Sequence, residues 1–138
     1  MQKSLAFAII SIFLLFSPSP ARGADDSIRA LRQLSKEIDR YSQDMIFHGS
    51  EGHADEIVSY GKKLIERAEK LIKEIDARPP MKTKEENEKM IAALKRIVQK
   101  TNEAVTLANE GKTDAAIAAS RKASFQAKQL RQQLQALK

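Results

Sequence analysis

The stretch IVSYGKKLIERAEKLIKEI, residues 57–75, carries the clearest structural signal in the chain. Its apolar residues recur every three or four positions, the spacing that places side chains on one face of an α-helix. They are Ile57, Val58, Gly61, Leu64, Ile65, Ala68, Leu71, Ile72 and Ile75. Charged residues fill most positions between them, as on a helix with one buried and one solvated face. This stretch therefore predicts an amphipathic helix that packs against other helices.

Three further segments show the same spacing, and no segment shows the sustained alternation that is typical of β-strands. The segment before residues 57–75 contains Ile28, Leu31, Leu34, Ile38, Tyr41 and Met45. A later one contains Met90, Ile91, Leu94, Ile97, Val98, Thr101, Val105 and Ala108. The last is thinner, with small residues that allow close approach: Ala116, Ala119, Ala123, Ala127, Leu130, Leu134 and Leu137. The fold class is therefore predicted to be all-α.

Residues that end or begin helices separate these segments. Gly49 to Gly52 is expected to end the first helix, because glycine adopts the left-handed conformation at low cost. Pro79-Pro80 ends the second helix, and Thr83 with Glu86 has the pattern of a capping box that begins the third. Residues 109–112 join the last two helices. Such short connections predict an up-down-up-down antiparallel four-helix bundle made of two αα-hairpins.

A short repeat supports a duplication of the hairpin. Glu51-Gly52-His53-Ala54-Asp55 at the first turn lines up with Glu110-Gly111-Lys112-Thr113-Asp114 at the other. Thr113 is a predicted N-cap of the fourth helix. The repeat falls on equivalent turns of the two halves, which favours a tandem pair of hairpins.

Residues 1–23 have the features of a secretory signal peptide. Lys3 supplies a positive start, an apolar run extends from Leu5 to Phe16, and small residues precede an expected cleavage point near Gly23. The run is too short to span a hydrocarbon layer of about 30 Å. We therefore expect residues 24–138 to form a single periplasmic domain, exported across the inner membrane and without a membrane span.

Composition and charge exclude several classes of function. The formal net charge is +6, and acidic and basic residues alternate without a basic block, so nucleic acid is not an expected partner. The chain has no cysteine, which excludes disulfides, thiolate metal sites and cysteine nucleophiles. No nucleophile–base pair or acid pair is recognisable, so an enzyme is not expected.

Both histidines of the chain lie at the first turn. His48 closes the first helix and His53 opens the second, so the turn should hold them at the same end of the bundle. Glu51 lies between them, and Asp44 lies one helical turn before His48 on the same face. Two imidazoles with one or two carboxylates suit Cu(II), Zn(II) or Ni(II), with Cu(II) favoured by intrinsic affinity. These four residues are candidate ligands of one metal site; two unconnected surface histidines are the alternative interpretation.

The pattern His48-Gly49-x-x-Gly52-His53-Ala54-Asp55, followed by an apolar helix, resembles the small metal-binding protein (SmbP) family of exported, histidine-rich four-helix bundles. The resemblance covers most of the chain after residue 23 and is clearest in residues 44–70 and 102–114. It implies that histidines at heptad spacing along the helices bind copper and other divalent metals. His48 and His53 match two such positions.

This chain departs from the family pattern at other positions. Tyr41 and Tyr60 stand at the neighbouring heptad positions, and Ala108 and Lys112 stand where histidines of the second turn would be. The chain is therefore similar to a divergent family member that lacks most histidines, and the resemblance implies at most one weak site.

A more distant resemblance is to the four-helix b-type cytochromes. Leu107 to Lys112 is similar to their third turn, and Ala77 to Pro80 to their central loop. Their haem requires a methionine near the start of the first helix and a histidine near the end of the last. Here the first helix is expected to begin at Ser27, and the chain ends with residues 132–138, which contain no histidine. The likeness supports the fold and implies no haem.

These observations leave two functions open. The chain is predicted to be an exported metal-binding protein, resembling a buffer for copper or another divalent metal. The alternative is a divergent bundle without metal that acts as a structural or partner-binding module in the cell envelope, with an unknown protein partner.

Overall fold

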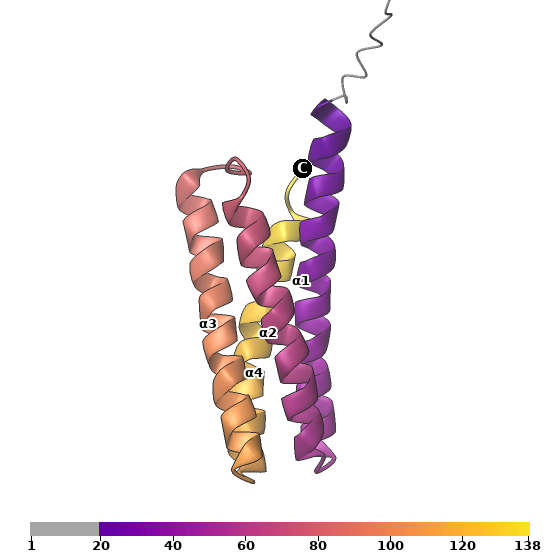
Figure 1. Ribbon diagram of the computed structural model, residues 1–138, viewed down its shortest axis with the longest axis vertical. Coiled ribbons are helices and arrows are strands. Elements are labelled where there is room, and N and C mark those ends of the chain that lie inside the picture. Colours follow the sequence, from indigo (N-terminus) through magenta and orange to yellow (C-terminus); the bar gives the residue numbers. More distant parts are fainter. Residues whose placement is uncertain (1–19) are drawn as a thin grey trace, which may run out of the picture.

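Four helices make up most of residues 20–138, the part of the chain that the computed structural model describes (Figure 1). They are α1 (Pro20–Ser50), α2 (Ala54–Asp76), α3 (Lys84–Asn109) and α4 (Thr113–Gln135). Each helix makes its main contacts with its two neighbours in the cycle α1, α2, α3, α4. The α1–α2 and α3–α4 turns lie at one end of the bundle, and the α2–α3 connection lies at the other (Figure 1). The predicted up-down-up-down four-helix bundle is confirmed.

Helix α1 begins at Pro20, earlier than the Ser27 expected from the sequence. Proline is tolerated at the first helical position, where its missing N–H has no partner to lose. The N-terminal turns of α1 extend past the bundle end that holds the α2–α3 connection (Figure 1). The predicted signal peptide lies outside the described residues, except for residues 20–23 at the start of α1. Within residues 20–138, no helix combines the length and the apolar character needed to cross a membrane.

The interior of the bundle is formed by the helix faces that the sequence predicts. Large aliphatic side chains from α1, α2 and α3 meet small alanines and two leucines from α4. The fully enclosed residues include Leu31, Ile38, Met45, Ile57, Leu64, Leu71, Ile75, Leu94, Ile97, Ala116, Ala123, Ala127, Leu130 and Leu134. This continuous apolar interior fixes the relative positions of the helix ends, and with them the two turns.

Two glycines allow helices to approach closely near the end that holds both hairpin turns. A Cβ atom added at Gly61 in α2 would lie 2.5 Å from Val105 Cγ2 in α3. One added at Gly49 in α1 would lie 2.7 Å from Ile57 Cδ1 and 2.9 Å from Ile117 Cγ1. Real Cβ atoms do not approach so closely, so Gly49 allows α1 to pack tightly against α2 and α4, and Gly61 allows α2 to pack tightly against α3.

An ion pair that the sequence did not reveal joins α1 to α4. Asp39 is enclosed, with 3% of its side chain exposed, and its Oδ2 atom lies 2.8 Å from Arg131 Nη1. Gln43 donates a hydrogen bond to the other carboxylate oxygen, at 3.0 Å. The buried carboxylate therefore has two partners, as a buried charge requires.

The two predicted N-caps have different outcomes. Thr83 caps α3, since its hydroxyl oxygen accepts a hydrogen bond from the Glu86 backbone N–H at 3.1 Å. The prediction for Thr113 is wrong, because Thr113 is the first residue of α4 and Lys112 is the N-cap, without a side-chain hydrogen bond. The tight turn before α4 causes this shift: the Lys112 N–H bonds to the Leu107 carbonyl, and the helix begins at the next residue.

Candidate metal centre

The first turn, residues 48–53, ends α1 with a defined set of backbone hydrogen bonds. Gly52 has a φ of 87°, the left-handed conformation predicted for a glycine in this turn. The Gly52 N–H donates to the Gly49 carbonyl at 3.0 Å, and the His53 N–H donates to the His48 carbonyl at 3.0 Å. This pair of bonds is the Schellman motif. It ties the backbone of His53 directly to the backbone of His48.

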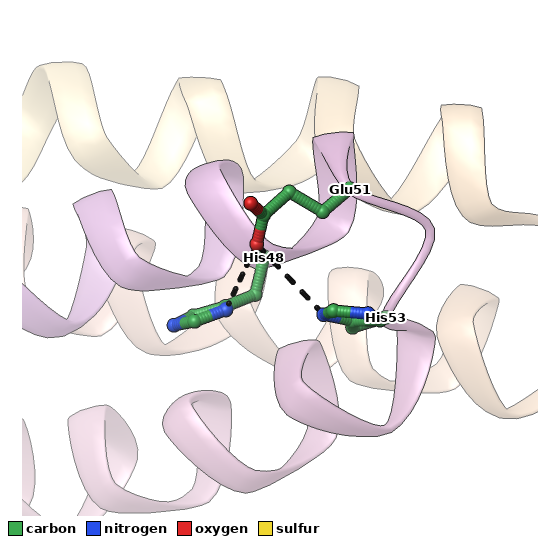
Figure 2. Close-up of side chains that lie close together, drawn as sticks. All are labelled: His48, Glu51 and His53. Atoms are coloured by element: carbon green, nitrogen blue, oxygen red, sulfur yellow. Dashed lines mark ion pairs between the residues drawn. The ribbon is translucent and has the colours of Figure 1, made fainter.

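Glu51 lies between the two histidines, and its carboxylate points toward both imidazole rings (Figure 2). Its Oε2 atom is 3.4 Å from His48 Nδ1 and 3.8 Å from His53 Nδ1. One ligand atom from each of the three residues lies within 4.8 Å of the others, a grouping that could hold a metal ion. The structure thus brings together three of the four candidate ligands.

Asp44, the fourth candidate, lies outside this group. It is half-buried on α1, four residues before His48. Four residues correspond to about 6 Å along a helix axis. Glu51 and His53 lie beyond the C-terminal end of α1, whereas Asp44 lies within it.

Burial differs among the three grouped residues. The His48 side chain is 27% exposed, and its Nδ1 atom is enclosed with no hydrogen-bond partner among the described residues. Glu51 is 47% exposed and His53 is 58% exposed. The group therefore has an enclosed side at His48 and an open side at His53.

Aromatic rings pack around the enclosed side, a feature that sequence reasoning missed. The Tyr60 ring stacks on the His48 ring, with centroids 5.4 Å apart and planes inclined by 7°. Phe47 meets the same imidazole edge to face, at 5.2 Å and 80°. Tyr41 packs against Tyr60 at 6.1 Å. The seven-residue spacing between Tyr60 in α2 and His53, the residue that precedes this helix, was a signal that the two lie on the same side of the bundle.

The second turn, residues 107–112, has the same backbone conformation. Gly111 has a φ of 74°, and its N–H donates to the Ala108 carbonyl at 3.1 Å. The Lys112 N–H donates to the Leu107 carbonyl at 2.9 Å. These two hydrogen bonds therefore match their counterparts in the first turn, which supports the repeat found in the sequence.

This match corrects one sequence-based assignment. Leu107, rather than the expected Ala108, occupies the position equivalent to His48, because the carbonyl of each accepts a hydrogen bond from the N–H five residues later. Ala108 is equivalent to Gly49. Lys112 pairs with Glu110 in the second turn, with Nζ and Oε2 2.7 Å apart. An ammonium group thus sits beside the second carboxylate, where His53 sits beside the first.

Comparisons with models of known protein families, with curated proteins and with solved structures give no significant match.

Proposed function

We propose that this protein is an exported, periplasmic binder of a divalent metal ion, which His48, Glu51 and His53 hold at the first turn. One observation carries the proposal: a single oxygen of Glu51 faces the Nδ1 atoms of both imidazoles, at 3.4 and 3.8 Å. Nitrogen and oxygen donors bind Zn(II) at about 2.0–2.2 Å, which places neighbouring donors roughly 3–4 Å apart. The two distances from Glu51 Oε2 to the imidazole nitrogens fall in that range.

The alternative explanation of the cluster is a simple ion pair between Glu51 and protonated histidines. Charge-assisted hydrogen bonds between nitrogen and oxygen are about 2.7–2.9 Å long. Both distances in the cluster are longer, and the enclosed His48 Nδ1 atom has no hydrogen-bond partner among the described residues. A bound cation would give this nitrogen, the carboxylate and the second imidazole a common partner.

The donor set favours Cu(II), and Ni(II) and Zn(II) should bind more weakly at the same site. Imidazole and carboxylate donors suit all three ions, and intrinsic affinity rises from Ni(II) to Cu(II) and falls again at Zn(II). The chain has no cysteine to select a softer ion. Three protein ligands on a half-open turn leave further coordination positions to water or exchanging ligands. Such a site is suited to reversible metal buffering.

The signal-like sequence of residues 1–23 supports the proposed location. A positive start, an apolar run and small residues before Gly23 are the features that direct export. A reversible metal site in the periplasm would hold copper or another divalent ion outside the inner membrane.

Calorimetric titration of the tag-free protein with Cu(II) tests the proposal. We expect one ion per chain for the natural sequence and no binding for the double variant His48→Ala, His53→Ala. Lys112→Ala at the second turn is the matched control, and it should bind as the natural chain does. Undiminished Cu(II) binding by the double variant would rule out this site.

A further inference from the structure

We propose that Tyr60 is the positioning residue of the metal site, because its ring holds the His48 imidazole in the orientation that metal binding requires. This inference rests on the proposed function. Its evidence is the nearly parallel stack of the two rings, with centroids 5.4 Å apart and planes inclined by 7°.

A histidine that binds a metal needs a neighbouring group that restricts the orientation of its imidazole ring. Rotation about the bond between Cβ and the imidazole is broad, with no sharp staggered minimum. Metal-binding histidines usually solve this by donating their second N–H to a carboxylate, a carbonyl or water. At His48, Nδ1 is the proposed metal donor and faces the Glu51 carboxylate at 3.4 Å, so the second N–H would be the one on Nε2, on the other side of the ring. That contact alone leaves the ring plane weakly defined.

Ring packing supplies the missing restraint. An offset parallel stack is one of the preferred geometries of aromatic pairs, and tilting the imidazole away from it would lose that contact. Tyr60 lies on α2 and His48 on α1, so the stack also ties the ligand to a second helix. Phe47 touches the same ring, but it is exposed and is the chain neighbour of His48, so it provides less independent support.

Tyr60 is itself held in place by its surroundings. It is half-buried and packs against the apolar core. The Tyr41 ring lies 6.1 Å away, and the Lys63 ammonium lies 5.0 Å from the centre of the Tyr60 ring. The stacking surface for His48 is thus a supported part of the bundle. The ring plane of His48 is set before metal arrives, and affinity depends on that preorganisation.

Cu(II) affinity, measured against a chelator of known strength, tests this inference. Tyr60→Leu keeps apolar contact with the core but removes the ring. We expect this variant to bind Cu(II) about tenfold more weakly, because losing a residue that orients a metal ligand typically weakens metal affinity by about tenfold or more. Tyr60→Phe keeps the ring and should restore affinity to within about twofold. Rescue by phenylalanine separates ring stacking from any role of the hydroxyl group.

The matched control is Tyr41→Leu, which removes a half-buried tyrosine that is not stacked on His48. It should change affinity by less than Tyr60→Leu does, and thermal unfolding of each metal-free variant should confirm that the bundle is intact. Tyr60→Leu binding as tightly as the natural chain, while the double histidine variant does not bind, would overturn the role of Tyr60 alone. If the double histidine variant bound Cu(II) as tightly as the natural chain does, the metal site itself would be overturned.

Discussion

Gly52 and Gly111 adopt the same left-handed conformation at the two turns that close one end of the bundle, with φ angles of 87° and 74°. Each donates its N–H to the carbonyl of the residue three positions earlier. The backbone conformation of the candidate metal-binding turn is therefore present twice in the molecule. Only side chains distinguish the candidate site from its counterpart, so substitutions can exchange their properties.

The first prediction is that two substitutions create a second metal site. Leu107→His with Lys112→His would place imidazoles at the positions equivalent to His48 and His53, around Glu110, which already occupies the position of Glu51. Calorimetry should then show two Cu(II) ions per chain. The second ion should bind about tenfold more weakly, because Ala119 stands at the position equivalent to Tyr60 and offers no ring to stack on.

Glu110→Ala provides the control for this design. Added to the two new histidines, it should return the stoichiometry to one ion per chain, since imidazoles without the carboxylate lack the third donor. A single bound ion in the variant that retains Glu110 would show that the turn conformation and these three residues do not suffice for binding.

The second prediction concerns tyrosine fluorescence. The chain has two tyrosines and no tryptophan, so its ultraviolet emission comes from Tyr41 and Tyr60. In the variant Tyr41→Phe all of it comes from Tyr60, whose ring stacks on His48. One equivalent of Cu(II), a paramagnetic ion, should quench this emission. Zn(II), which is diamagnetic, should not.

His48→Ala with His53→Ala in the Tyr41→Phe background is the reference for that experiment. Its emission should stay unchanged at one equivalent of Cu(II). Equal quenching with and without the histidines would mean that the ion binds near Tyr60 through other ligands.

The sequence was sufficient to predict most of the fold because the relevant signals are local. Apolar spacing identified the buried faces, and the glycines and prolines identified the breaks. The proximity of His48 and His53 also followed from a short turn between two helices. These features need only chain geometry over a few residues, which the hydrogen bonds of the turns then confirmed.

The features that were missed depend on how helices rotate and approach in three dimensions. Asp39 and Arg131 are far apart in the sequence, and nothing local marks them as a pair. In the sequence, Tyr60 stands out only as a heptad position without a histidine, and its stacking on His48 depends on the rotation of α2 relative to α1. Asp44 has helical spacing from His48, but the other candidate ligands, Glu51 and His53, lie beyond the end of that helix.

The third prediction tests the close packing of α2 and α3. Gly61→Ala should lower the free energy of unfolding by about 1–3 kcal/mol, because the new methyl group would meet Val105 Cγ2 at 2.5 Å. Urea denaturation of Gly61→Ala and of a control variant, at equal protein concentration, measures this loss of stability. Ser59→Ala, on an exposed position of the same helix, should stay within about 0.5 kcal/mol of the natural chain. Equal stability of the two variants would contradict the tight helix contact.

The fourth prediction concerns the ion pair between α1 and α4. Arg131→Ala should destabilise the bundle more than Asp39→Ala. Asp39 is 3% exposed and would remain as a buried charge, whereas Arg131 is 35% exposed and can turn toward water. We expect a loss of about 2–3 kcal/mol for Arg131→Ala in urea denaturation. A larger loss for Asp39→Ala would contradict this asymmetry.

Electron paramagnetic resonance of the tag-free protein with one equivalent of Cu(II) tests the proposed site most directly, because the nitrogen superhyperfine splitting of the copper signal counts the nitrogen atoms bound to the ion. Two nitrogens are predicted for the natural chain, from His48 and His53. One nitrogen is predicted for His53→Ala, whose position is exposed and whose loss leaves the core intact. A spectrum of the natural chain without two coordinated nitrogens, or one that His53→Ala leaves unchanged, would contradict metal binding at this turn.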